Sequence, residues 1–109
     1  MTVSELAALC GFKVLAAPSP ERTVDGVYIG DLLSWVMGRA KENDAWITIM
    51  SNVNVIAVAT LSDVSCVIFA EGVTPDDELI GLAGTKGINL LSSDGAAYET
   101  ALKIFGVQK

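Results

Sequence analysis

Histidine is missing altogether from this 109-residue chain. Histidine is the commonest general base near neutral pH, a frequent zinc ligand, and the partner of the nucleophile in Ser-His and Cys-His pairs. The phosphate-binding pattern GxxxxGK[ST] and the dinucleotide fingerprint GxGxxG are missing as well. These absences exclude the commonest catalytic designs. They predict a protein that is not an enzyme and that needs no cofactor.

Charged residues are scarce, at 18% of the chain against about a quarter in an average globular protein. Lysine and arginine number 7 against 13 acidic residues, which gives a net charge of -6, and the basic residues are scattered. The lack of a basic stripe argues against nucleic acid or an anionic membrane as a partner. So few charges cover a small surface poorly. We therefore expect a homo-oligomer, with a dimer favoured.

The two cysteines, Cys10 and Cys66, lie in apolar segments and form no CxxC pair, which predicts buried, reduced thiols. No apolar run reaches the ~20 residues that span a bilayer, and the first residues do not resemble a signal peptide. We therefore expect a cytoplasmic protein. With 51% hydrophobic residues, a chain of this length is expected to form a single domain over residues 1–109.

The first elements can be predicted from local signals. Thr2 and Glu5 form a capping box that opens a helix over residues 3–10, and Gly11 ends it. Strands are expected at residues 13–16 and 23–29. Asp31 is positioned to cap a second helix over residues 32–40.

Beyond residue 40, short apolar strands alternate with amphipathic helices. This order requires parallel strands joined by crossover helices, so the sequence predicts an α/β fold, a single domain with a mainly parallel sheet. The segment 53–61 is rich in β-branched residues, so a strand remains an alternative there. The expected elements are strand 45–49, helix 53–61, strand 66–69, helix 75–86, strand 88–91 and helix 95–105.

Polar side chains follow several of the predicted strands. In a parallel sheet, ligands bind beyond the carboxyl ends of the strands, where helix N-termini converge. Ser, Asn and Asp are also the preferred helix caps, so capping is the competing interpretation for each residue. The segments 51–54 and 92–94 offer more polar groups than one cap requires. The candidate ligand-binding residues at this end are Asp31, Ser34, Ser51, Asn52, Asn54, Ser92, Ser93 and Asp94.

Other conspicuous residues have structural interpretations. Gly81, Gly84 and Gly87 recur at a spacing of three, which predicts close packing of their helix against a neighbour rather than nucleotide binding. The acidic residues 76–78 suit the first turn of a helix, and no metal site is predicted there. Trp35 and Trp46 are expected as core or interface anchors, and the Tyr28 hydroxyl could contribute to a site at the strand end, but the core is favoured for all three.

The segments 21–34, 45–48 and 54–59 together resemble the DRTGG domain family, and the similarity runs over nearly the whole chain. Of the Asp-Arg-Thr-Gly-Gly run that names the family, only Arg22 and Thr23 match strictly. The resemblance implies a fold similar to the N-terminal domain of HPr kinase/phosphorylase and, more distantly, of Mur ligases. Such domains also occur beside CBS domains, which implies regulation or ligand sensing.

Three functions remain open at this point. The first is a regulatory module that binds a small polar or phosphorylated metabolite at the strand ends, with Arg22 supplying an anion contact, and signals to a partner kinase or another signalling protein. The second is an oligomerisation module without a ligand. The third, favoured least, is a small phosphotransferase with Asp31 or Asp94 as the base.

Overall fold

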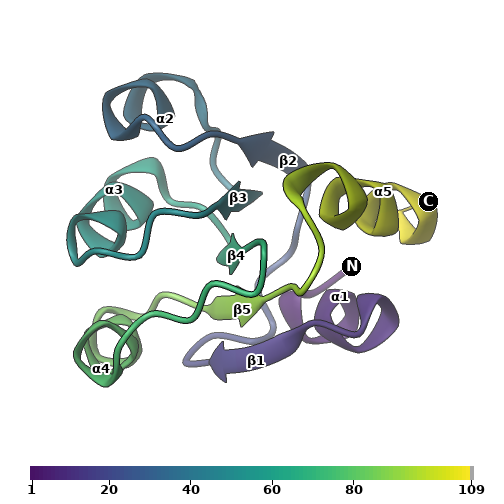
Figure 1. The fold of residues 1–109 in the computed structure, drawn as a ribbon, viewed down its shortest axis with the longest axis horizontal. Helices are drawn as coiled ribbons and strands as arrows, with labels where there is room; N and C mark the ends of the chain where they lie inside the picture. The colour runs from purple at the N-terminus through teal and green to yellow at the C-terminus, as the bar shows by residue number, and fades with distance from the viewer. Residues whose placement is uncertain (109) are drawn as a thin grey trace.

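A five-stranded sheet lies between two layers of helices in the computed structural model, which describes residues 1–108 (Figure 1). The order across the sheet is β1-β5-β4-β3-β2. The strands are β1 (Lys13–Ala16), β2 (Gly26–Ile29), β3 (Asp44–Thr48), β4 (Cys66–Phe69) and β5 (Leu90–Ser92). The helices are α1 (Val3–Cys10), α2 (Leu33–Arg39), α3 (Asn54–Ser62), α4 (Asp77–Lys86) and α5 (Ala97–Val107).

Helix α1 begins and ends where its local signals predict. The Thr2 hydroxyl accepts from the Glu5 N–H at 3.1 Å, and the Thr2 N–H donates to the Glu5 carboxylate at 2.8 Å. That backbone donor lowers the pKa of Glu5 below its usual value. Gly11 ends the helix in the left-handed conformation, at φ 71°, which a residue with a side chain adopts at a cost.

Strands β2, β3, β4 and β5 are parallel, and β1 pairs with β5 in the antiparallel direction. Every residue of β3 and β4 is buried, as expected for strands covered by helices on both faces. The predicted α/β fold, a single domain with a mainly parallel sheet and alternating helices, is therefore confirmed.

The two faces of the sheet carry separate cores. Helices α2, α3 and α4 cover one face, where Trp46 and Phe69 are fully buried, and α1 and α5 cover the other face, where Ile47 and Ile68 are buried (Figure 1). The connections after β2, β3 and β4 therefore lie on one face, and the loop after β5 leads to α5 on the other face. The loops after the adjacent strands β4 and β5 thus lead to opposite faces, which is the arrangement found at a topological switch point.

Several sequence-based predictions need correction. The strand expected over 23–29 begins only at Gly26, since Thr23 forms an isolated bridge with Thr2. Segment 53–61 is helical as predicted, as α3, which settles the open alternative. Trp35 was expected in the core but is 52% exposed, because α2 is a short helix above the edge of the sheet and buries Val36 instead.

The glycine-spaced helix does not pack closely within the chain. A Cβ placed at Gly81 or Gly84 would have no neighbour within 4 Å in the described part of the chain, so close packing there is not observed. Gly87 has a different role, because its φ of 77° ends α4 in the left-handed conformation. The prediction of two buried, unpaired cysteines is confirmed, and complete burial raises the pKa of Cys66 to about 12.

Candidate functional site

The carboxyl end of the sheet, defined here as the loops that follow β2, β3, β4 and β5, gathers most of the predicted site residues. Because these four strands run in parallel, their ends face the same side of the molecule (Figure 1). Eight of the nine predicted residues lie there, on the loops, at the end of β5 or at the start of a helix. They are Asp31, Ser34, Ser51, Asn52, Asn54, Ser92, Ser93 and Asp94.

Arg22 does not lie with them. Its guanidinium donates to the Asp63 carboxylate at 3.0 Å, to the Asp63 carbonyl at 2.9 Å and to the Asn43 side-chain oxygen at 2.8 Å. Asn43 precedes β3 and Asp63 precedes β4, so this cluster lies at the opposite, amino end of the sheet. The prediction that Arg22 joins a ligand site at the strand ends is therefore corrected. The side chain instead links the turn before β3 to the turn before β4 by hydrogen bonds.

Those two turns explain why an arginine is used. Asn43 and Asp63 both have left-handed backbones, at φ 67° and 55°, which is an unfavourable conformation for residues other than glycine. The planar guanidinium has enough donors to reach both residues at once, which a lysine ammonium does less well. Arg22 thus stabilises a strained pair of connections.

The switch point between β4 and β5 is the place where open α/β sheets usually bind ligands. Here the two loops are bonded to each other. The Glu71 N–H donates to the Gly95 carbonyl at 2.8 Å, and the Gly72 N–H donates to the Ser93 carbonyl at 2.9 Å. Glu71 and Gly72 adopt positive φ values of 61° and 69° in this crossing. The usual crevice is therefore closed by backbone hydrogen bonds.

The serines of this loop are correspondingly occupied. The Ser93 hydroxyl is buried and hydrogen-bonds the Thr100 hydroxyl at 2.7 Å, and Ser92 is buried within β5 opposite Lys13. Only Asp94 is exposed. Of the predicted group after β5, Ser92 and Ser93 are thus closed to a ligand, because they pack inside the protein.

Asp31 has a role that its sequence position did not predict. Helix α2 begins after Leu32 with no side-chain cap, so Asp31 does not cap it. Instead, one carboxylate oxygen of Asp31 accepts from the Thr48 hydroxyl at 2.8 Å and from the Ile49 N–H at 2.9 Å. Asp31 therefore fixes the loop after β2 to the end of β3, and its second oxygen makes no hydrogen bond to residues 1–108.

The loop after β3 holds the polar groups that remain free. The Asn52 side chain accepts from the Asn54 N–H at 2.9 Å and so stabilises the first turn of α3. Ser51 and Asn54 are exposed, and their side chains make no hydrogen bond within the described residues. The same holds for Ser34 in the first turn of α2. These three exposed side chains lie in the loop after β3 and in the first turns of α2 and α3.

The helices that start at this end differ in the charge of their first turns. The first turn of α4 carries Asp77 and Glu78, and that of α5 carries Glu99, whereas those of α2 and α3 carry no acidic residue. The start of α2 has the Asp31 carboxylate just before it, and that of α3 has no acidic residue in the preceding loop. Because the positive end of a helix dipole favours an anion only when acidic side chains do not already neutralise it, α3 offers the best position for one negative group.

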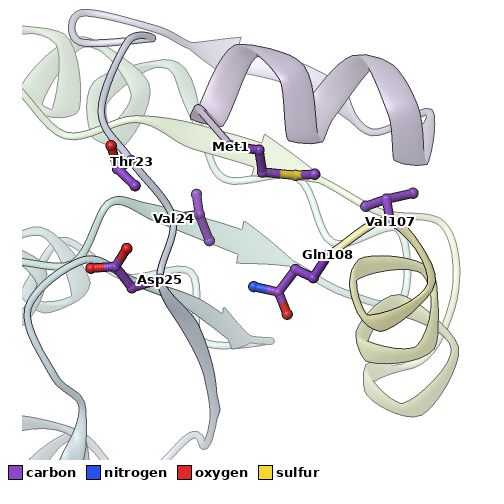
Figure 2. A pocket seen from close by; sticks show the side chains of 6 residues that line it. All are labelled: Met1, Thr23, Val24, Asp25, Val107 and Gln108. Carbon is purple, nitrogen blue, oxygen red and sulfur yellow. The ribbon is translucent and has the colours of Figure 1, made fainter.

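Two pockets lie elsewhere on the molecule. The first, at the amino end of the sheet, has a volume of about 570 Å³ and is lined by Met1, Thr23, Val24, Asp25, Val107 and Gln108 (Figure 2). A second hollow of about 470 Å³ runs beside β2, near Arg39 and Lys41. Neither contains a residue that the sequence analysis selected as a ligand contact.

Sequence reasoning missed a polar network at the amino end. Asn89, which is 1% exposed, donates to the Ser19 and Ser65 carbonyls at 2.7 and 2.9 Å and accepts from the Ser19 N–H at 3.0 Å. A polar residue within the apolar run 88–91 was the one available signal, because a buried amide needs partners. Those partners are distant in sequence and could not be read from it.

Within residues 1–108, no helix has the length and apolar character needed to cross a membrane. The same described residues contain no group of three or more Cys, Asp or Glu side chains arranged to hold a metal ion.

Comparisons with known proteins agree with this fold. A family model described as "DRTGG domain" matches residues 5–107. The CBS and DRTGG domains of the regulatory region of a Clostridium perfringens pyrophosphatase, crystallised with the activator diadenosine tetraphosphate, superimpose with a TM-score of 0.74 at 16% sequence identity. The match covers 94% of this chain and 45% of that one, so this chain corresponds to less than half of the regulatory region. No curated protein matches the chain.

Proposed function

The chain belongs to the DRTGG domain family, and on that premise we propose that it is a regulatory module that binds a small polar ligand and passes its state to a partner protein. The proposed binding site is the carboxyl end of β2 and β3. It comprises Ser34, Ser51 and Asn54, with the free oxygen of Asp31 at its border and Asn52 holding the loop in shape. We propose no catalytic role for these residues.

One observation carries this proposal. Ser51 and Asn54 are exposed beside the N-terminus of α3, and within residues 1–108 their side chains have no hydrogen-bonding partner. The competing interpretation, capping, does not account for these two side chains, because the N-cap of α3 is Val53, no side chain caps the helix, and the Asn54 N–H donates to the Asn52 side chain. Polar side chains that make no hydrogen bond inside the protein are available to a ligand. This agrees with the observation that segment 51–54 has more polar groups than one helix cap requires.

The charges restrict the ligand. Asp31, Glu71 and Asp94 are exposed at this end, so a chain of several phosphates would meet repulsion. A single phosphate at the start of α3 would avoid it. We therefore propose a metabolite with at most one phosphate, such as a nucleoside monophosphate or a sugar phosphate. The dinucleotide activator of the Clostridium pyrophosphatase shows a nucleotide acting on a regulatory region that combines DRTGG and CBS domains.

A thermal-shift screen tests the proposal directly. The panel contains adenosine, AMP, ATP, diadenosine tetraphosphate, sugar phosphates and acetyl phosphate. A ligand at 100 times its dissociation constant stabilises the fold by about 2.7 kcal/mol, which raises the Tm of a domain of this size by roughly 10 °C or more. We expect a saturable shift with a monophosphate and a smaller one with ATP.

Two matched variants locate the site. Ser51→Ala and Asn54→Ala should abolish the ligand-dependent shift while leaving the Tm of the free protein unchanged. Ser4→Ala removes an exposed serine from α1, away from the proposed site, and should preserve the shift. A flat response to the whole panel overturns the proposal. It would leave oligomerisation as the function, a candidate that the exposed apolar side chains of α2 and α5 favour.

A further inference from the structure

Helix α5 exposes an apolar stripe that no other part of residues 1–108 covers. Tyr98, Leu102 and Phe105 are 70%, 48% and 78% exposed. Their spacing of four and then three residues places them on one side of the helix. A different side, which includes Thr100 and Ile104, is buried against the sheet. The stripe therefore does not contribute to the core, and a surface helix normally carries polar residues at such positions.

The stripe faces away from α1. Helix α5 packs beside α1 on one face of the sheet and contacts β3 (Figure 1). Burial raises the pKa of Cys10, at the end of α1, and the charge of Lys103 opposes that rise, so Lys103 lies on the side of α5 toward α1. With 3.6 residues per turn, Tyr98 and Phe105 project about 140–160° around the helix from Lys103. They therefore point toward the β2 side of the molecule.

The sheet on that side is also uncovered. Ile29, the last residue of β2, is in register with Ile47, whose side chain is buried on the face that α1 and α5 cover. Paired residues of neighbouring strands point to the same face, so Ile29 lies on the α5 face too. It is nevertheless half exposed, because α5 lies over β3. The exposed apolar surface thus extends from α5 toward β2.

This apolar surface has nearly the size that a dimer needs. The rings of Tyr98 and Phe105 expose roughly 300 Å², and with Leu102 and Ile29 the apolar total is roughly 400 Å². A standard interface buries ~800 Å² on each partner, of which roughly 450–500 Å² is apolar. These four side chains therefore supply most of the apolar area that one partner contributes.

The charges beside the stripe are arranged so that a second copy complements them. Glu99 and Lys103 are exposed, lie one turn apart on the same flank of α5, and form no ion pair within the described residues. In an antiparallel pair of α5 helices with a twofold axis near Ala101, Glu99 of each copy lies beside Lys103 of the other. Tyr98 of each copy likewise lies beside Phe105 of the other. Parallel packing would instead place like charges together.

From these observations we infer that α5 packs antiparallel against α5 of a second copy of this chain and forms the interface of a dimer. Leu102 lies next to the twofold axis, and Ile29 borders the contact. Two chains of net charge -6 repel at long range, so the two Glu99–Lys103 contacts provide the local match that association requires. The inference is independent of the proposed ligand, because Ser51 and Asn54 lie outside this surface.

The first test is the mass of the full chain in solution, by sedimentation and light scattering over a wide range of concentration. We expect a dimer. Leu102→Glu places two carboxylates opposite each other at the axis and should raise the dissociation constant about 100-fold. Leu61→Glu, the same substitution at an exposed leucine of α3, is the matched control and should remain dimeric. Circular dichroism verifies that both variants are folded.

Charge reversal tests the antiparallel arrangement. Glu99→Lys alone and Lys103→Glu alone should each weaken the dimer about tenfold at low salt, because like charges then meet twice. A mixture of these two variants restores both opposite-charge contacts, so the heterodimer should form in preference to either homodimer. Native mass spectrometry measures this preference.

The opposite results would overturn the inference. A monomeric wild type excludes the dimer, and a Leu102→Glu variant that dimerises as tightly as the wild type excludes α5 as its interface. Dissociation by Leu61→Glu but not by Leu102→Glu would assign the interface to the apolar groove between α3 and α4. A mixture without preference for the heterodimer would exclude the antiparallel pairing of Glu99 with Lys103.

Discussion

The two ends of the sheet are built from similar polar residues but use them differently. At the amino end, Arg22, Asn43, Asp63 and Asn89 are bonded to one another or to backbone groups of distant segments. At the carboxyl end, Ser51 and Asn54 are exposed and make no side-chain hydrogen bond within residues 1–108. The amino end therefore maintains the fold, and the carboxyl end leaves groups available for binding.

This difference changes how the family's name motif is interpreted. Arg22 and Thr23, its two strict matches, lie at the amino end. The Thr23 carbonyl accepts a hydrogen bond from the buried Ser65 hydroxyl, and the Arg22 guanidinium donates one to the Asp63 carboxylate. A motif at this place stabilises connections rather than contacting a ligand at the strand ends. Mutations at the amino end should thus lower stability, and those at the carboxyl end should alter binding.

Asn89→Ala should give the largest loss of stability. The substitution leaves the Ser19 carbonyl and N–H and the Ser65 carbonyl without their partner, and an unsatisfied buried group costs about 1–3 kcal/mol. We expect the free energy of unfolding to fall by about 3 kcal/mol in urea titrations. Asn54→Ala, the matched change at the carboxyl end, should cost less than about 0.5 kcal/mol. Similar losses for both variants would contradict the division of roles.

Alkaline pH provides a second probe of the amino end, because Cys66 is the first residue of β4. Burial raises its pKa to about 12, from 9.0, so the folded state favours the neutral thiol. This stability is complete below pH 9 and is lost as the pH rises from there through 12. Between pH 9 and 10.5 we expect a loss of about 1.5 kcal/mol.

Two cysteine variants isolate that contribution in pH-dependent urea titrations. Cys66→Ala should show a smaller fall in stability above pH 9, while Cys10→Ala should keep most of it. If both variants retain the full pH dependence, other groups are responsible and the burial of the Cys66 thiol is not the cause.

Arg22→Lys should have an intermediate effect. The charge is retained, but a single ammonium does not span Asp63 and Asn43 as the guanidinium does. The ion pair with Asp63 is partly exposed, so its own contribution is below about 1 kcal/mol. We expect a total loss of about 1 kcal/mol in thermal and urea unfolding, with unchanged binding of any ligand found in the screen. A weaker ligand affinity would reinstate Arg22 as a contact.

The sequence was sufficient for elements that depend on local signals. The bounds of α1 follow from the Thr2 and Glu5 capping box and from Gly11, and β4 coincides with the apolar run 66–69. The alternation of strands and helices then fixed the parallel sheet. These features could be predicted because each depends on neighbours within a few residues.

Longer-range features could not be predicted in this way. Arg22 meets Asp63 across 41 positions of sequence, and Asn89 meets Ser19 across 70. The closure of the switch point likewise depends on two loops meeting, those at Glu71 and Gly95. A general rule about parallel sheets placed the predicted site at the carboxyl end of the strands. Which of its polar residues stay free was decided by contacts that only the folded chain shows.

Asp31→Asn should have the smallest effect on stability, and it tests most closely whether residues at the carboxyl end of the sheet affect binding rather than stability. The amide keeps an oxygen that accepts from Thr48 and Ile49, so the loop stays attached to β3, and we expect a loss below about 0.5 kcal/mol. The substitution also removes a negative charge beside Ser51 and Asn54. A phosphorylated ligand should therefore bind a few-fold more tightly at low salt, with the gain disappearing at high salt. Calorimetry at two salt concentrations measures this difference. An unchanged affinity would mean that the phosphate binds away from the carboxyl end of β2. A large loss of stability would mean that Asp31 maintains the fold, as the residues at the amino end do.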